Sequence, residues 1–214
     1  SIRFSLDYNF EVSVICLLLA SACDALDGFF SRVLKSESEL GAELDSLSDF
    51  LSFAVAPCIL IYMSLINENE VIGSIALLLF VVFSCIRLAV FNLNKDSAED
   101  ISSFFSGVPT PAGCGLLILP LVQSFLGFDW AKENEIFLSI YIFIIGLLLI
   151  SNLPTFSSKQ FKIKISKKNY LYFSIFFFLI YLSLINFLWI AINIIGIMYL
   201  LSIPVSVWTY KSKS

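Results

Sequence analysis

The sequence predicts an all-α integral membrane protein, a polytopic bundle of about seven helices that cross the bilayer. Hydrophobic residues make up 58% of the 214 residues and charged residues only 14%, against about 45–50% and about 25% in typical soluble domains. The mean hydropathy is +0.91. From Asn169 to Tyr210 the chain has no charged residue, a run long enough for two crossings of about 20 residues each. A soluble domain cannot bury this much apolar surface, so the bilayer is the expected partner.

Apolar runs of this kind divide the chain into seven expected crossings within one membrane domain, residues 1–214. Their approximate ranges are 12–33, 44–66, 71–92, 112–128, 136–153, 170–187 and 189–209. Between the third and fourth, Pro109 and Pro111 predict a non-helical segment, because proline interrupts a helix and restrains the residue before it.

Basic residues predict the orientation of these crossings, because Lys and Arg are enriched in cytoplasmic loops. When alternate loops are assigned to opposite sides, eleven Lys and Arg residues fall on one side and only Arg3 and Lys132 on the other. The loops near 34–43, 94–111 and 154–169 and the C-terminus are therefore expected in the cytoplasm. Residue 1 is expected outside, which suggests that one N-terminal crossing is missing from this sequence.

Two features of the composition exclude whole classes of function. The chain has no histidine, so mechanisms that need an imidazole base are excluded, and a carboxylate is a plausible base. The net charge of −4 argues against a nucleic-acid partner.

Four aspartates lie at the cytoplasmic ends of the first two expected crossings, where placing a charged side chain in the membrane costs free energy. Asp24 and Asp27 are three residues apart, and Asp45 and Asp49 are four apart, so each pair lies on one face of a helix. Carboxylates at membrane depth normally face a partner or a wet cavity. Four of them together favour hard cations such as Mg²⁺, Mn²⁺ or Ca²⁺.

Small and basic residues in the same stretch are typical of a phosphate site. Gly28 and Arg32 follow Asp24 at intervals of four residues, and Gly41 precedes Asp45 by the same interval. Glycine lets a bulky substrate approach the backbone, and arginine offers several donors to a phosphate. Each residue alone also has a structural interpretation, as a helix cap or a packing contact.

The whole stretch, residues 24–49, resembles the signature of the CDP-alcohol phosphotransferases, D-x2-D-G-x2-A-R-x8-G-x3-D-x3-D. Every fixed position matches except the alanine, which is Ser31 here. Three further segments resemble the bacterial membrane-type phosphatidylserine synthases, a branch of that family: LGAELDSLSDFLSFAVAP, CIRLAVFN and FSGVPTPAGCG. The piece SNLPTFSSK also fits. The resemblance covers roughly residues 1–160, and the last two crossings match only in hydrophobic character.

The resemblance implies transfer of a phosphatidyl group from CDP-diacylglycerol to the hydroxyl of L-serine, with release of CMP. It implies a two-metal site for Mg²⁺ or Mn²⁺ held by four aspartates, of which Asp49 is also the general base. The CDP-binding positions that it implies are Asp24, Gly28, Ser31, Arg32 and Gly41. It further suggests a homodimer in the bacterial inner membrane, with the active site at the cytoplasmic face.

The serine pocket is a separate hypothesis. Arg87 is the one basic residue well inside an expected crossing, and serine needs a partner for its carboxylate. We therefore expect the pocket to be formed by Arg87 and Asn92 with the loop residues Gly107, Pro109 and Thr110. Alternatively, Arg87 extends to the cytoplasmic interface.

Two other functions are consistent with parts of the sequence. Another member of the family would use glycerol phosphate, choline or an inositol phosphate as acceptor. An ion-coupled transporter would also use carboxylates inside the membrane. However, the charges cluster at one membrane face and no internal repeat is visible, which disfavours a transporter.

Overall fold

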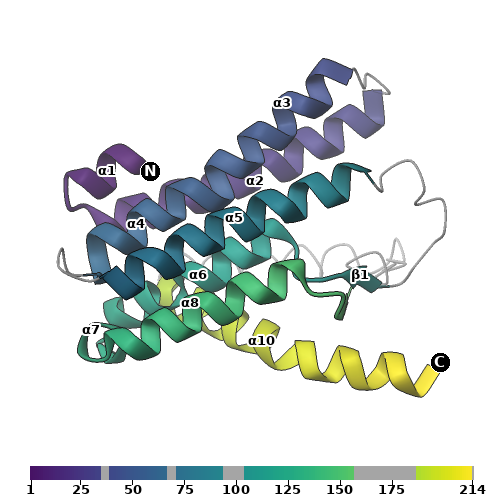
Figure 1. The fold of residues 1–214 in the computed structure, drawn as a ribbon. Helices are drawn as coiled ribbons and strands as arrows, with labels where there is room; N and C mark the ends of the chain where they lie inside the picture. Colours follow the sequence, from purple (N-terminus) through teal and green to yellow (C-terminus); the bar gives the residue numbers. More distant parts are fainter. Residues whose placement is uncertain (35–38, 67–70, 94–103, 157–186, 214) are drawn as a thin grey trace, which may run out of the picture.

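A computed structural model describes residues 1–34, 39–66, 71–93, 104–156 and 187–213. The fold is a bundle of helices, as the sequence predicts, with one short pair of strands. Figure 1 shows that the α2–α3 end of the bundle, strand β1 and the C-terminus lie toward one end, whereas the N-terminus and α7 lie toward the other.

The N-terminal part of the fold is a helical hairpin. The short α1 (Ile2–Leu6) precedes α2 (Phe10–Leu34), and α3 (Glu39–Phe50) runs back beside it. Helix α3 passes without a break into a π-helical turn, η1 (Leu51–Val55), and then into α4 (Ala56–Leu65).

The rest of the bundle consists of longer apolar helices joined by short elements. These elements are α5 (Val71–Leu93), β1 (Phe104–Ser106), α6 (Thr110–Phe125), α7 (Trp130–Glu133), α8 (Glu135–Ile150), β2 (Pro154–Phe156) and α10 (Leu188–Lys213).

Six of the seven expected crossings correspond to helices in the described part of the chain. By length and composition, three helical segments in the described ranges could span a bilayer, Glu43–Leu65, Val71–Leu93 and Leu188–Thr209. The expected crossings 112–128 and 136–153 correspond to α6 and α8, which are shorter, with 16 residues each. The expected crossing 170–187 lies almost entirely outside the described residues, as does the loop at 157–168.

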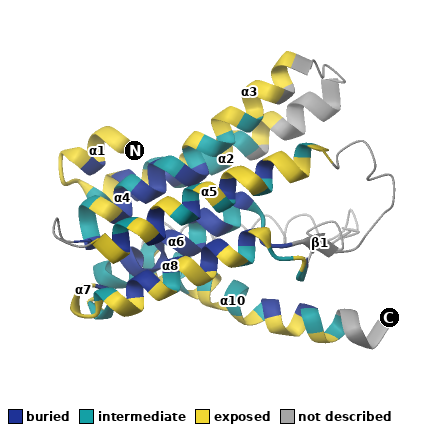
Figure 2. Cartoon of the chain, in the orientation of Figure 1, coloured by how far each residue is buried: buried dark blue, intermediate teal, exposed yellow. Residues whose placement is uncertain are grey.

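Helix α6 forms the centre of the bundle. It contacts α4, α5, α7, α8 and α10, and nearly all of its residues between Gly113 and Val122 are buried. Large apolar side chains on the outer helices are exposed instead, among them Leu78 at 67% and Met198 at 65%. Figure 2 shows this gradient from the buried centre to the exposed outer helices. An apolar exterior of this kind is what a bilayer requires.

Among the described residues, a two-stranded antiparallel sheet departs from the all-helical prediction. In it, Phe104 pairs with Phe156 and Ser106 with Pro154. The expected non-helical segment around Pro109 and Pro111 is also shorter than predicted. Pro109 caps α6, and the helix begins at Thr110 with Pro111 in its first turn, because proline is tolerated before the helical hydrogen bonds start.

Gly107 holds the turn that leads from β1 into α6. Its φ of +74° is a left-handed conformation that favours glycine. Its N–H donates to the Leu153 carbonyl at 2.9 Å, and its carbonyl accepts from the Thr155 hydroxyl at 2.8 Å. These two hydrogen bonds therefore attach the turn to the segment that follows α8.

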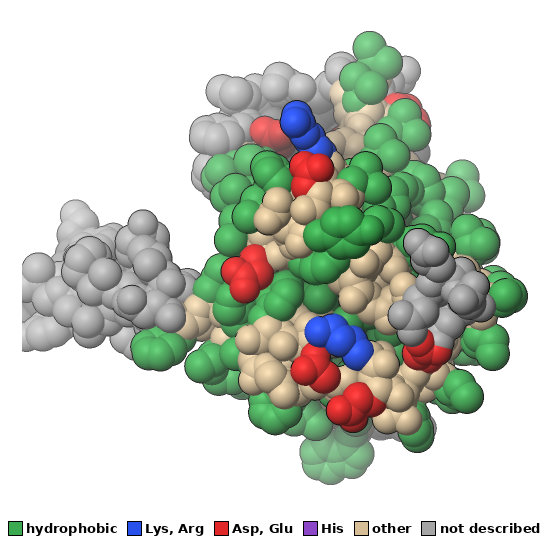
Figure 3. All heavy atoms as spheres, turned by 90° about the vertical axis from the view of Figure 1, so that its left-hand side faces the viewer, with side chains coloured by type: hydrophobic (Ala, Val, Ile, Leu, Met, Phe, Trp, Pro, Cys, Tyr) green, Lys and Arg blue, Asp and Glu red, His purple; other side chains and the backbone are tan. Residues whose placement is uncertain are grey.

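The opposite end of the bundle, seen in Figure 3, presents apolar surface with scattered charges. Its two basic residues are both paired with acids. Arg3 lies 4.0 Å from Asp7, and Lys132 lies 2.9 Å from Asp129. The two basic residues that the loop assignment placed on one side of the membrane therefore both lie at this end, on α1 and α7.

Replacing Gly107 by alanine should destabilise the fold more than the same change at Gly127. An added Cβ at Gly107 would lie 2.6 Å from the Ser151 carbonyl oxygen and 2.8 Å from that of Leu149, whereas at Gly127, with φ +87°, it would meet open space. We expect a loss of about 2–4 kcal/mol for Gly107→Ala and about 1 kcal/mol for Gly127→Ala. Thermal unfolding in detergent measures both, and equal losses would contradict this role of the turn.

Candidate active site

Three of the four singled-out aspartates meet between α2 and α3. Carboxylate oxygens of Asp24, Asp45 and Asp49 all lie within 4.8 Å of one another. Asp45 and Asp49 are adjacent on α3 because a separation of four residues is about one helical turn, and the hairpin brings Asp24 on α2 against them. The geometry therefore comes from the two helical faces that the spacing predicts.

The environment of this cluster suits a cation. Asp24 and Asp49 are half-buried and Asp45 is exposed. The side chains of Asp24 and Asp49 share a hydrogen bond, and Asp45 adds a further negative charge beside them. Carboxylates this close repel one another unless a proton or a cation lies between them. An all-oxygen set of donors fits Mg²⁺ or Mn²⁺ better than zinc.

The remaining residues of the signature are placed less closely or not described. Asp27 is exposed on α2 and is not one of the three clustered carboxylates. Gly41 is exposed on α3, four residues before Asp45. Gly28, Ser31 and Arg32 belong to α2, but their side chains lie outside what the structure describes.

Arg87 connects the acidic cluster to the start of α6. Its Nη1 donates to the Thr110 hydroxyl oxygen at 2.7 Å, and its guanidinium interacts electrostatically with Asp49. Two residues of the expected serine pocket are thus in direct contact, and they lie beside the carboxylate expected to act as base.

The other expected pocket residues have structural contacts. The Asn92 amide donates to the Ser46 hydroxyl at 2.9 Å, which ties α5 to α3 next to Asp45. Gly107 has both backbone polar groups paired within the protein. Pro109 is the N-cap of α6, directly before Thr110.

Two residues that sequence reasoning missed also lie at this place. Tyr199 on α10 interacts with Arg87, and Thr155 on β2 lies beside it. Tyr199 falls within an uncharged apolar run, where nothing distinguishes it from the lipid-facing residues around it. Thr155 belongs to the segment SNLPTFSSK. No local sequence pattern indicates that this segment pairs with β1.

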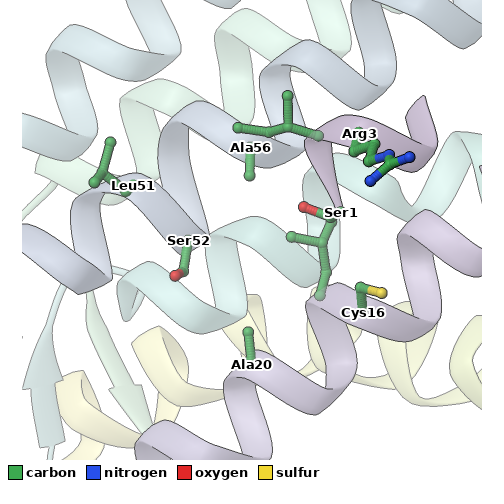
Figure 4. A pocket seen from close by; sticks show the side chains of 9 residues that line it. Ser1, Arg3, Cys16, Ala20, Leu51, Ser52 and Ala56 are labelled. Carbon is green, nitrogen blue, oxygen red and sulfur yellow. The ribbon is translucent and has the colours of Figure 1, made fainter. Parts of the chain in front are cut away.

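A cavity of about 360 Å³ lies between α1, α2, η1 and the start of α4. Figure 4 shows Cys16 and Ala20 of α2 facing Ser52 and Ala56, with Ser1 and Arg3 at one side. Ala20 is four residues before Asp24, and Ser52 is three residues after Asp49. The helical faces that carry the carboxylates therefore also line this mostly apolar space.

A comparison with family models agrees with the geometry of the acidic cluster. The model described as CDP-alcohol phosphatidyltransferase matches residues 1–208. The chain belongs to this family. The match includes α10, which the sequence resemblance covered only by its hydrophobic character. It also includes the residues of the clustered carboxylates and Arg87 within a single matched region.

Several curated relatives carry the name CDP-diacylglycerol–serine O-phosphatidyltransferase. The protein of Mycobacterium leprae is 37% identical over 161 residues, which are 72% of this chain and 52% of the relative. That of Helicobacter pylori is 32% identical over 168 residues, 77% and 70% of the two chains. That of Methanocaldococcus jannaschii is 34% identical over 147 residues, 68% and 65%. The match thus spans about half the length of the mycobacterial relative.

Removing one carboxylate from the cluster should weaken metal binding. We expect Asp45→Asn to reduce Mn²⁺ affinity by at least about tenfold, because a charged oxygen ligand is lost and the remaining two carboxylates attract the cation less. Titration of purified protein followed by Mn²⁺ electron paramagnetic resonance measures this. Glu43→Gln is the matched control, since Glu43 is exposed on the same helix outside the cluster. Equal affinities for the two variants would contradict a metal site here.

Proposed function

We propose that this protein transfers the phosphatidyl group of CDP-diacylglycerol to the hydroxyl of L-serine and releases CMP. The observation that carries the proposal is the cluster of Asp24, Asp45 and Asp49 with Arg87 beside it. The family match supports the reaction class. The names of the relatives support serine as the acceptor.

In the proposed reaction, the serine hydroxyl oxygen attacks the phosphorus that bears the lipid. A new oxygen–phosphorus bond forms, the bond from that phosphorus to the bridging oxygen of the pyrophosphate breaks, and CMP leaves. Asp49 accepts the hydroxyl proton as the attack develops. With no histidine in the sequence, a carboxylate is the suitable base, and Asp49 interacts with Arg87.

Two divalent ions, Mg²⁺ or Mn²⁺, would be held by Asp24, Asp45 and Asp49, with Asp27 as a fourth ligand. When bound, they neutralise the pyrophosphate and the departing CMP. The family signature supports binding of the CDP group by Asp24, Gly28, Ser31, Arg32 and Gly41. Glycine at two of these positions leaves room for the nucleotide beside the helix backbone.

The acceptor pocket is proposed to lie on the other side of Asp49, around Arg87. Arg87 would bind the serine carboxylate through its guanidinium, and Thr110 holds that guanidinium in place at 2.7 Å. Asn92, Gly107 and Pro109 shape the pocket by holding α5 and the start of α6. This arrangement would direct the serine hydroxyl toward Asp49 and the metals.

The proposed setting is one domain, residues 1–214, in the bacterial inner membrane, with the site at the cytoplasmic face. The excess of Lys and Arg on that side supports this orientation. A homodimer is proposed from the family resemblance.

Purified protein in detergent should release CMP from CDP-diacylglycerol only when L-serine and Mn²⁺ or Mg²⁺ are both present. EDTA should abolish the release, and Asp49→Asn should lower its rate by about 10²–10⁴-fold while CDP-diacylglycerol binding persists. Asp7→Asn, an exposed aspartate near the opposite end, serves as control. Release that depends on another alcohol but not on serine would overturn the acceptor, and near-normal turnover of Asp49→Asn would overturn the base.

Replacing Arg87 by lysine should raise the KM for serine by about tenfold, which corresponds to about 1.4 kcal/mol, because lysine cannot reproduce the fork of guanidinium donors. The KM for CDP-diacylglycerol should change little. Arg3→Lys is the matched control, since the Arg3 side chain is 91% exposed near the other end. Equal changes in both KM values would instead indicate a general structural role for Arg87.

A further inference from the structure

Buried polar groups without partners gather on the acceptor side of the site. Among the described residues, buried side-chain atoms of Ser84, Arg87 and Tyr199 lack a hydrogen-bond partner. Ser84 and Arg87 are three residues apart on α5 and so share one helical face. Tyr199 on α10 interacts with Arg87. Arg87 and Tyr199 thus bring two unpaired groups together, and Ser84 lies on the same face of α5.

These groups are all donors of hydrogen bonds. The Arg87 Nη1 donates a hydrogen bond to the Thr110 hydroxyl, whereas its Nε has no hydrogen-bond partner within the described part of the chain. The Tyr199 hydroxyl interacts with the Thr155 side chain, but no contact in the described part meets hydrogen-bond geometry. Its neighbour Thr155 donates its own proton to the Gly107 carbonyl at 2.8 Å. A guanidinium and a tyrosine hydroxyl that interact with each other and have donors left unpaired suit an anion with several acceptor oxygens.

An unpaired buried donor destabilises the folded protein unless a ligand or a water satisfies it. The arrangement relative to Asp49 favours a ligand. Arg87 interacts electrostatically with both Asp49 and Tyr199. An amino acid whose hydroxyl faces Asp49 would therefore have its carboxylate near Arg87 and Tyr199.

We propose that the Tyr199 hydroxyl binds the acceptor carboxylate together with Arg87, so that α10 contributes a residue that determines acceptor specificity. This inference rests on the proposed function and extends it to a helix that carries no charged residue before its last turn. Tyr199 donates its proton to one carboxylate oxygen, and Arg87 donates to the same group. Removing the hydroxyl should weaken the binding of serine and leave the CDP-lipid unaffected.

The test is the Tyr199→Phe variant, assayed by CMP release in detergent with serine and CDP-diacylglycerol varied separately. We expect the KM for serine to rise by about tenfold or more, as for loss of a hydrogen bond to a charged group. The kcat and the KM for CDP-diacylglycerol should stay within about twofold of wild type. An unchanged KM for serine, or equal increases in both KM values, would overturn the proposal.

Tyr141→Phe is the matched control, because it removes another largely buried tyrosine hydroxyl. The Tyr141 hydroxyl donates to the Leu116 carbonyl at 2.7 Å, so its removal should lower the melting temperature without changing the KM for serine. Tyr199→Phe removes an unpaired hydroxyl, so its melting temperature should not fall. A Tyr199→Phe protein that unfolds more easily than Tyr141→Phe would show that the hydroxyl is structural and would overturn the proposal.

The wild-type protein in the same assay separates the two proposals. Without serine-dependent CMP release from wild type, the proposed function fails and the inference fails with it. With serine-dependent release from wild type and an unaltered Tyr199→Phe variant, only the role of Tyr199 is lost.

Discussion

Repulsion among three carboxylates is the constraint around which this bundle is organised. Asp24, Asp45 and Asp49 lie within 4.8 Å of one another in a protein whose other surfaces are largely apolar. Their negative charges must be compensated, and Arg87 supplies one positive charge from α5. The remaining imbalance favours divalent cations, and in the proposed reaction the same cations would meet the charge of the pyrophosphate.

Polar contacts between the surrounding helices hold these charged side chains in position. Asn92 binds Ser46 and so fixes α5 against α3 beside Asp45. Thr110 holds Arg87 at the start of α6, the most buried helix. The turn at Gly107 sets where α6 begins, because its backbone is bonded to Leu153 and Thr155. A site assembled from four separate segments thus depends on a few polar contacts between apolar helices.

Much of this could be predicted from sequence, because the signals are local. Carboxylates three or four residues apart must share a helical face, and apolar runs indicate crossings. The β1–β2 pair could not be predicted, since its strands are three residues each and lie almost 50 positions apart. Thr155 and Tyr199 were missed because their roles depend on partners that are distant in the sequence. The family match gave the reaction class, which the spacing of aspartates alone does not determine.

The central claim is that the serine hydroxyl oxygen attacks the lipid-bearing phosphorus at this cluster. The most direct measurement uses L-serine with the heavy oxygen isotope in its hydroxyl group, CDP-diacylglycerol and the purified protein, followed by mass spectrometry of the products. The account predicts phosphatidylserine that carries the label, together with unlabelled CMP. Phosphatidate and a labelled serine ester of CMP would mean attack at the other phosphorus and would contradict the account.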